Sequence, residues 1–111
     1  MWGRMLMSFR KKKLPEITTL PTGFRVNDTI VDWPQIASIK AFKLDLLTYD
    51  MICFAVEVDG NDHYIQLSEE WPGFKELSDD LESRFAFPDG WWGAVAHPAF
   101  KTNETVLYQR T

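Results

Sequence analysis

The side chains that could carry out catalysis are few, because the chain has one cysteine and two histidines. Nucleophilic catalysis requires a nucleophile beside a base that is itself held in place. Cys53 stands between Ile52 and Phe54 in an apolar stretch, which is typical of a buried structural thiol. None of the serines occurs in a Gly-x-Ser-x-Gly motif. We therefore expect no catalytic residue and a protein that is not an enzyme.

A metal site would have to join His63 and His97 with carboxylates such as Asp59, Asp62 or Asp89. The two histidines lie far apart in the sequence, and none of the close ligand spacings of known metal sites is present. Asp59 and Asp62 belong instead to an Asp-Gly-Asn-Asp stretch that is typical of a hairpin turn. Glycine-rich phosphate loops are absent as well. We expect no bound metal and no cofactor.

The most unusual stretch is Gly-Trp-Trp-Gly-Ala-Val-Ala-His-Pro-Ala-Phe at residues 90–100, which contains no charged residue. Adjacent tryptophans point to opposite faces of a strand and diverge by about 100° on a helix, so one ring should be partly exposed. One interpretation is a structural cap over the sheet. The other is a surface for a protein partner, because tryptophan is frequent in binding hot spots. On this second interpretation the partner-binding candidates are Trp91, Trp92 and Phe100, and His97 is a turn residue.

Paired carboxylates occur at Glu69-Glu70 and at Asp79-Asp80. Neighbouring residues on a helix point about 100° apart, so Asp79 and Asp80 cannot aim at one substrate atom as an acid–base pair. Such pairs are typical of a solvated acidic face. The alternative is that they contact the basic rim of a partner. Asp79 and Asp80 are therefore the remaining partner-binding candidates.

Charge is unevenly distributed, because five of the twelve cations and none of the sixteen acids precede Glu16. The acidic remainder should repel nucleic acid, and we expect no nucleic-acid partner. Residues 1–20 have the composition of a basic N-terminal tail. This tail is either simply solvated or a contact for anionic lipid. In the second case the membrane-contact candidates are Arg10, Lys11, Lys12 and Lys13.

Alternating apolar residues and turn signals predict a series of antiparallel strands in a single domain over residues 21–111. A hairpin is expected at 24–31, turning at Asn27-Asp28, with further strands at 38–44, 51–58, 63–68 and 104–110, the last at an edge. One stripe of apolar residues predicts an amphipathic helix over about 72–86, with Pro72 in its first turn. The stripe consists of Phe74, Leu77, Leu81 and Phe85.

This order of elements, with Trp33, Ile36 and Ile39 spaced by three ahead of the third strand, resembles small uncharacterised bacterial proteins of pleckstrin-homology-like pattern. The resemblance covers about residues 22–86, whereas residues 87–111 do not match it. It implies an α+β fold in which an antiparallel β meander, a bent sheet of about five to seven strands, is closed by one helix. Folds of this kind usually serve as binding platforms, although a fold alone does not establish a function.

We therefore expect a small acidic binding module that acts on another protein, with an inhibitor or immunity-type protein as one specific form. The alternative is a membrane-peripheral module anchored by its basic tail; an enzyme that uses Cys53 is a third class. The single cysteine and the lack of any stretch of about 18 apolar residues favour the cytoplasm. An unpaired last strand could also pair with a second copy and give a homodimer.

Overall fold

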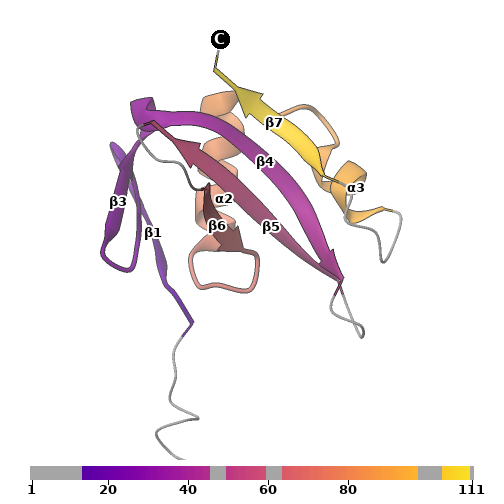
Figure 1. Cartoon of the computed structure of the whole chain (residues 1–111), viewed down its shortest axis with the longest axis horizontal. Coiled ribbons are helices and arrows are strands. Elements are labelled where there is room, and N and C mark those ends of the chain that lie inside the picture. The colour runs from indigo at the N-terminus through magenta and orange to yellow at the C-terminus, as the bar shows by residue number, and fades with distance from the viewer. Residues whose placement is uncertain (1–13, 46–49, 60–63, 98–103, 111) are drawn as a thin grey trace, which may run out of the picture.

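Two antiparallel sheets share one hydrophobic core in the computed structural model, which describes residues 14–45, 50–59, 64–97 and 104–110 (Figure 1). In these residues the first sheet has the strand order β1-β2-β3 and the second has the order β6-β5-β4-β7. The first sheet contains β1 (Ile17–Leu20), β2 (Gly23–Val26) and β3 (Thr29–Asp32). The second contains β4 (Ile36–Asp45), β5 (Asp50–Val58), β6 (Tyr64–Ser68) and β7 (Thr105–Gln109).

The first sheet confirms the hairpin and adds one strand that the sequence did not indicate. β2 and β3 turn at Asn27, whose φ of 53° is the left-handed conformation that asparagine tolerates. β1 pairs with β2 along its whole length and buries Ile17 in the core. The predicted tail therefore ends earlier than expected, because residues 17–20 belong to a sheet.

The second sheet confirms the four remaining strands. β4 and β5 pair over almost their full lengths and curve together across the molecule (Figure 1). A short 3₁₀ helix, η1 (Trp33–Gln35), carries the chain from the first sheet into β4. β7 pairs with β4 alone and therefore lies at an edge of the sheet, as expected for the last strand.

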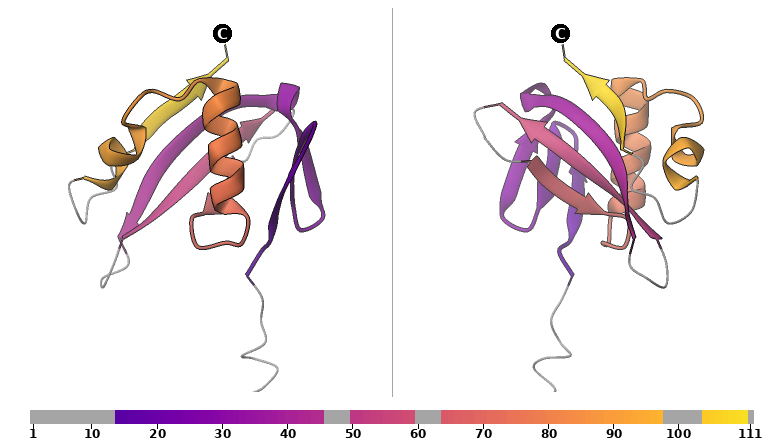
Figure 2. Two further views of the ribbon diagram at one scale, coloured as in Figure 1. Left: turned by 180° about the vertical axis from the view of Figure 1, so that it is seen from behind. Right: turned by 45° about the vertical axis from the view of Figure 1, so that its right-hand side comes forward.

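The predicted amphipathic helix is present as α2 (Phe74–Phe85), which crosses the inner face of the second sheet (Figure 2). It begins after Gly73, whose φ is 89° and where a Cβ would lie 1.9 Å from the backbone oxygen of Ile17. Only glycine allows β1 to approach so closely. The role expected for Pro72 in the first helical turn is wrong, because Pro72 precedes the helix and its carbonyl accepts a hydrogen bond from the Ile17 N–H.

A second helix, α3 (Trp91–Ala96), lies beside β7 and contacts β4, β5 and β7. Gly90 starts it with a φ of 75°, and the side chains of Trp91 and Val95 are buried. The expectation of a single sheet closed by one helix is therefore wrong for the described residues, which form two sheets and two helices. A six-residue helix is too short to show the helical period on which such a prediction depends.

The core lies between the two sheets and the two helices (Figure 2). Its centre consists of apolar side chains that are at most 2% exposed: Phe24, Val31, Ile36, Ile39, Ala41, Phe54, Val56, Leu67, Leu77, Leu81 and Val95. Burial of such side chains is the main favourable contribution to folding. Among the residues described, no helix has the length and apolar character needed to cross a bilayer.

Candidate functional site

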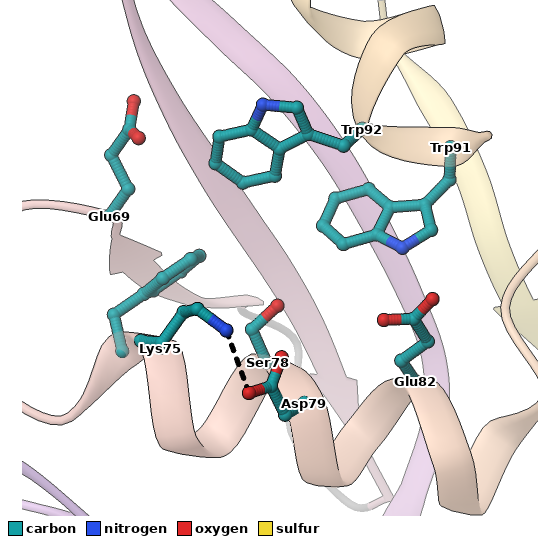
Figure 3. Close-up of a pocket in the computed structure, with 8 residues that line it drawn as sticks. Glu69, Lys75, Ser78, Asp79, Glu82, Trp91 and Trp92 are labelled. Atoms are coloured by element: carbon teal, nitrogen blue, oxygen red, sulfur yellow. Dashed lines mark hydrogen bonds and ion pairs between the residues drawn. The ribbon is translucent and has the colours of Figure 1, made fainter.

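A pocket of about 400 Å³ lies between α2 and α3 (Figure 3). α2 contributes five side chains to it, α3 contributes both tryptophans, and the segment after β6 contributes one glutamate. The lining residues are Glu69, Phe74, Lys75, Ser78, Asp79, Glu82, Trp91 and Trp92. We call this site the α2–α3 pocket. It joins three of the five predicted partner-binding residues: Trp91, Trp92 and Asp79.

The two tryptophans of the pocket have different environments. Trp91 is 6% exposed, and its ring lies 5.6 Å from that of Phe54 and 5.5 Å from that of Phe87. Trp92 is 43% exposed and meets the Trp91 ring edge-on, at 5.4 Å and 74°. The expectation that one ring is partly exposed is therefore confirmed, since Trp91 belongs to the core and Trp92 offers apolar surface to solvent. A partner surface at Trp92 stays a prediction.

Carboxylates surround the aromatic part of the pocket. Glu69 is held in place because its Oε1 accepts a hydrogen bond of 2.6 Å from the backbone N–H of Ile52. Asp79 pairs with Lys75 at 2.8 Å, and this contact raises the pKa of Lys75. Glu82 points toward Trp91 from the next turn of α2 (Figure 3). The pocket lining thus carries three acids and one base.

Ser78 brings a buried polar group into the same pocket. Its residue is only 6% exposed, and its hydroxyl points from α2 toward the space between the tryptophans and Glu69 (Figure 3). Within the described part of the chain, no hydrogen bond engages this hydroxyl. A hydroxyl group can both donate and accept hydrogen bonds, so one that faces a pocket without a protein partner is available to a ligand.

A lysine from the core face of β4 holds α3 in position. Lys43 is 1% exposed, donates a hydrogen bond of 2.8 Å to the carbonyl of Ala96 and lies 3.4 Å from the Asp50 carboxylate. The Ala96 carbonyl belongs to the last turn of α3, where carbonyl groups lack a partner within the helix. This contact fixes the C-terminal end of the helix that carries Trp91 and Trp92.

Asp80 lies outside the pocket, on another side of α2. It pairs with Arg84 at 3.0 Å, and the Arg84 guanidinium stacks over the Trp33 ring at 4.6 Å. Trp33 and Tyr108 in turn contact the ring of Phe85 at 6.4 and 4.6 Å. We call Trp33, Asp80, Arg84, Phe85 and Tyr108 the Trp33 cluster. Asp79 and Asp80 thus belong to two separate sites, because neighbouring residues on a helix point about 100° apart.

Cys53 has the environment expected of a structural thiol. It is fully buried, and burial, together with the nearby Glu69, raises the pKa of the Cys53 thiol to about 11. A thiol with this pKa is protonated at neutral pH and is a poor nucleophile. In the described ranges no cluster of three or more His, Cys, Asp or Glu side chains could hold a metal ion. His97 is exposed just after α3.

Several predicted residues lie outside the described part of the chain. They are the partner-binding candidate Phe100, the membrane-contact candidates Arg10, Lys11, Lys12 and Lys13, the turn residue Asp62 and the strand residue His63. The structure also brings into the pocket residues that the sequence did not single out. Ser78 and Glu82 follow Phe74 at helical spacings of four and eight, so this periodicity could have placed them on one side of the helix.

Comparison with protein-family models, with curated proteins and with solved structures finds no match to this chain. The functional proposals below therefore rest on the geometry of the α2–α3 pocket.

Proposed function

We propose that this protein is a non-enzymatic, cytoplasmic binding domain that binds another protein through the α2–α3 pocket. The observation that carries the proposal is the exposure of Trp92, at 43%, beside a tryptophan that is anchored in the core. A large rigid ring on a short, fixed helix loses little conformational freedom when a partner covers it. Exposed tryptophans in such settings are frequent hot spots.

The acids around the pocket support a partner with a basic surface. Glu69, Asp79 and Glu82 line it with a single lysine, and the chain as a whole carries sixteen acids against twelve cations. Opposite charges across an interface accelerate association and select against acidic competitors. An inhibitor or immunity-type protein that covers a basic active site is one specific form of this proposal.

The pleckstrin-homology-like resemblance remains part of the proposal. The antiparallel strands and α2 are consistent with it, whereas the division into two sheets and the presence of α3 depart from the single sheet and single helix that it implied. The alternative function is a membrane-peripheral module that uses Arg10, Lys11, Lys12 and Lys13. The edge position of β7 supports a homodimer, which size-exclusion chromatography of the full chain would detect.

The test is capture of a partner by the tagged full chain from its source cells, followed by reconstitution of the complex from purified components. Trp92→Ala is the test variant. Tyr64→Ala is the matched control, because Tyr64 is also an exposed aromatic residue, at 50%, but belongs to β6 and lies outside the pocket. We expect a stoichiometric partner that binds the wild type and the control and is lost from Trp92→Ala.

Two results would contradict the proposal. The first is a reconstituted complex that Trp92→Ala leaves intact. The second is the absence of a protein partner together with binding to vesicles that contain anionic lipid. If neutralising residues 10–13 abolished that vesicle binding, the membrane alternative would replace the proposal.

A further inference from the structure

We infer that the α2–α3 pocket binds the guanidinium group of an arginine side chain presented by the partner protein. This inference rests on the proposed function and adds the chemical identity of the group that enters the pocket. Four observations on the described residues support it: the charge of the lining, the tryptophan rings, the Ser78 hydroxyl and a second site on the same helix.

The lining is negative enough to favour a cation. Three carboxylates face one ammonium group, and that lysine belongs to an exposed pair: the side chains of Lys75 and Asp79 are 81% and 62% exposed. Exposed pairs at this helical spacing are weak, so Lys75 can turn away when another cation enters. Glu82 forms no ion pair with the described residues, and its carboxylate points toward the pocket (Figure 3).

The tryptophans provide faces on which a cation binds well. Trp92 and Trp91 lie nearly perpendicular to each other, and Phe74 completes the apolar part of the lining. The face of an aromatic ring is electron-rich and attracts cations, most strongly in tryptophan. Because Trp91 is fixed by the core and Trp92 is exposed, an entering cation would contact Trp92 first.

Ser78 supplies a hydrogen-bond acceptor at the α2 side of the pocket. The residue is 6% exposed, and its hydroxyl points into the pocket and receives no hydrogen bond from the described residues (Figure 3). Guanidinium carries five N–H donors in one plane, so it can bond to the hydroxyl and to a carboxylate of α2 or of Glu69 together. An apolar ligand would leave this hydroxyl without a partner.

The Trp33 cluster shows the same combination of groups satisfied within the chain. There the guanidinium of Arg84 stacks on a tryptophan at 4.6 Å and pairs with Asp80 at 3.0 Å. Asp80 is the helical neighbour of Asp79, so α2 places one aspartate near Trp33 of η1 and the other in the pocket that Trp91 and Trp92 of α3 line. This internal example favours arginine over lysine, because only a planar guanidinium stacks on a ring while it donates two parallel hydrogen bonds.

The test is a titration of the full-length protein with the peptide acetyl-Gly-Arg-Gly-amide. Binding is monitored through the change in the NMR signal of the Trp91 indole N–H. Two peptides of the same length are matched probes: one carries citrulline, which has the shape of arginine without its charge, and the other carries lysine. Because Trp92→Ala and Glu82→Gln change exposed residues, both variants should fold. Glu76→Gln is the matched control, since Glu76 is an exposed acid of α2 outside the pocket.

We expect saturable binding of the arginine peptide that weakens by about tenfold in Trp92→Ala, a change of about 1.4 kcal/mol. We expect a weakening of about threefold in Glu82→Gln and none in Glu76→Gln, because only the first removes a charge from the pocket. Citrulline should bind at least about tenfold more weakly than arginine, and lysine about threefold more weakly.

Absence of saturable binding, or equal binding of the arginine and citrulline peptides or of the arginine and lysine peptides, would overturn the inference. If the captured protein partner still depended on Trp92, the proposed function would stand without the arginine. If the partner were unaffected by Trp92→Ala as well, both proposals would fail.

Discussion

The α2–α3 pocket and the Trp33 cluster lie on two sides of α2 and both combine tryptophan with acidic side chains, but they differ in one respect. In the Trp33 cluster, the chain supplies its own arginine, which pairs with Asp80 and stacks on the ring of Trp33. In the α2–α3 pocket, Trp92 and Glu82 remain exposed beside the hydroxyl of Ser78. A cluster completed within the chain contributes to stability. In a site that the chain does not complete, the exposed side chains contribute little to stability and are available for binding.

The largest expected effect separates the two adjacent tryptophans. Trp91→Ala should lower the free energy of unfolding by about 3–5 kcal/mol, because it removes a buried ring that packs on Phe54 and Phe87. Trp92→Ala should lower it by less than about 1 kcal/mol, because its ring is largely exposed. Urea unfolding measures both values. Equal losses would mean that Trp92 is a core residue and that the pocket is not a separate surface.

The second effect concerns the lysine that anchors α3. Lys43→Met should lower the free energy of unfolding by about 3 kcal/mol, because Asp50 loses a buried cation and the Ala96 carbonyl loses its donor. Lys40→Met is the matched control on the same strand: its pair with Glu104 is long, at 4.0 Å, and more exposed. The control should cost less than about 1 kcal/mol. Similar losses in the free energy of unfolding for the two variants would show that Lys43 does not hold α3 in position.

The third effect tests a region that belongs to neither site. The pKa of the Cys53 thiol is raised from 9.0 to about 11, mainly by burial and then by Glu69. Above pH 9 the unfolded chain therefore loses this proton before the folded chain does. Stability should fall by on the order of 2 kcal/mol as the pH rises from about 9 to 11.

Urea unfolding in reductant across this pH range measures the fall. Cys53→Ala should be less stable at neutral pH but should show a smaller loss between about pH 9 and 11, since it has no thiol to ionise. Identical slopes for the wild type and the variant would show that other groups cause the pH dependence.

The smallest effect concerns the arginine that completes the Trp33 cluster. Arg84→Ala should lower the free energy of unfolding by about 1 kcal/mol, because the side chains of Arg84 and Asp80 are partly exposed, at 40% and 32%. Glu82→Gln should leave stability within about 0.5 kcal/mol of the wild type. Thermal unfolding of both variants provides the measurement. If Glu82→Gln lowered stability more than Arg84→Ala, the α2–α3 pocket and not the Trp33 cluster would be the region that stabilises the fold.

Much of the fold follows from local patterns in the sequence. The hairpin at Asn27, the strand pair at β4 and β5 and the apolar stripe of α2 each repeat with the period of their element. β1 could not be predicted in this way, because Ile17–Leu20 shows no clear alternation of apolar and polar residues. Its position depends on its pairing with β2. The division into two sheets did not follow either, because it depends on how η1 redirects the chain.

The candidate site was predicted in part for similar reasons. Residue type and adjacency selected Trp91, Trp92 and Asp79, and the structure brings these three together. The same reasoning grouped Asp80 with them, although the helix turns it toward Arg84. Ser78 and Lys43 were missed because neither is notable by type; their importance comes from burial and from contacts distant in sequence.

The most direct test of the comparison is a side-by-side measurement of Trp33→Ala and Trp92→Ala, in which both unfolding and retention of the purified partner are recorded. We predict that Trp33→Ala lowers the free energy of unfolding by about 2 kcal/mol and keeps the partner, since Trp33 packs on Phe24, Phe85 and Arg84. We predict the reverse for Trp92→Ala, with stability nearly unchanged and the partner lost. If Trp33→Ala lost the partner while Trp92→Ala kept it, the α2–α3 pocket would not be the binding site.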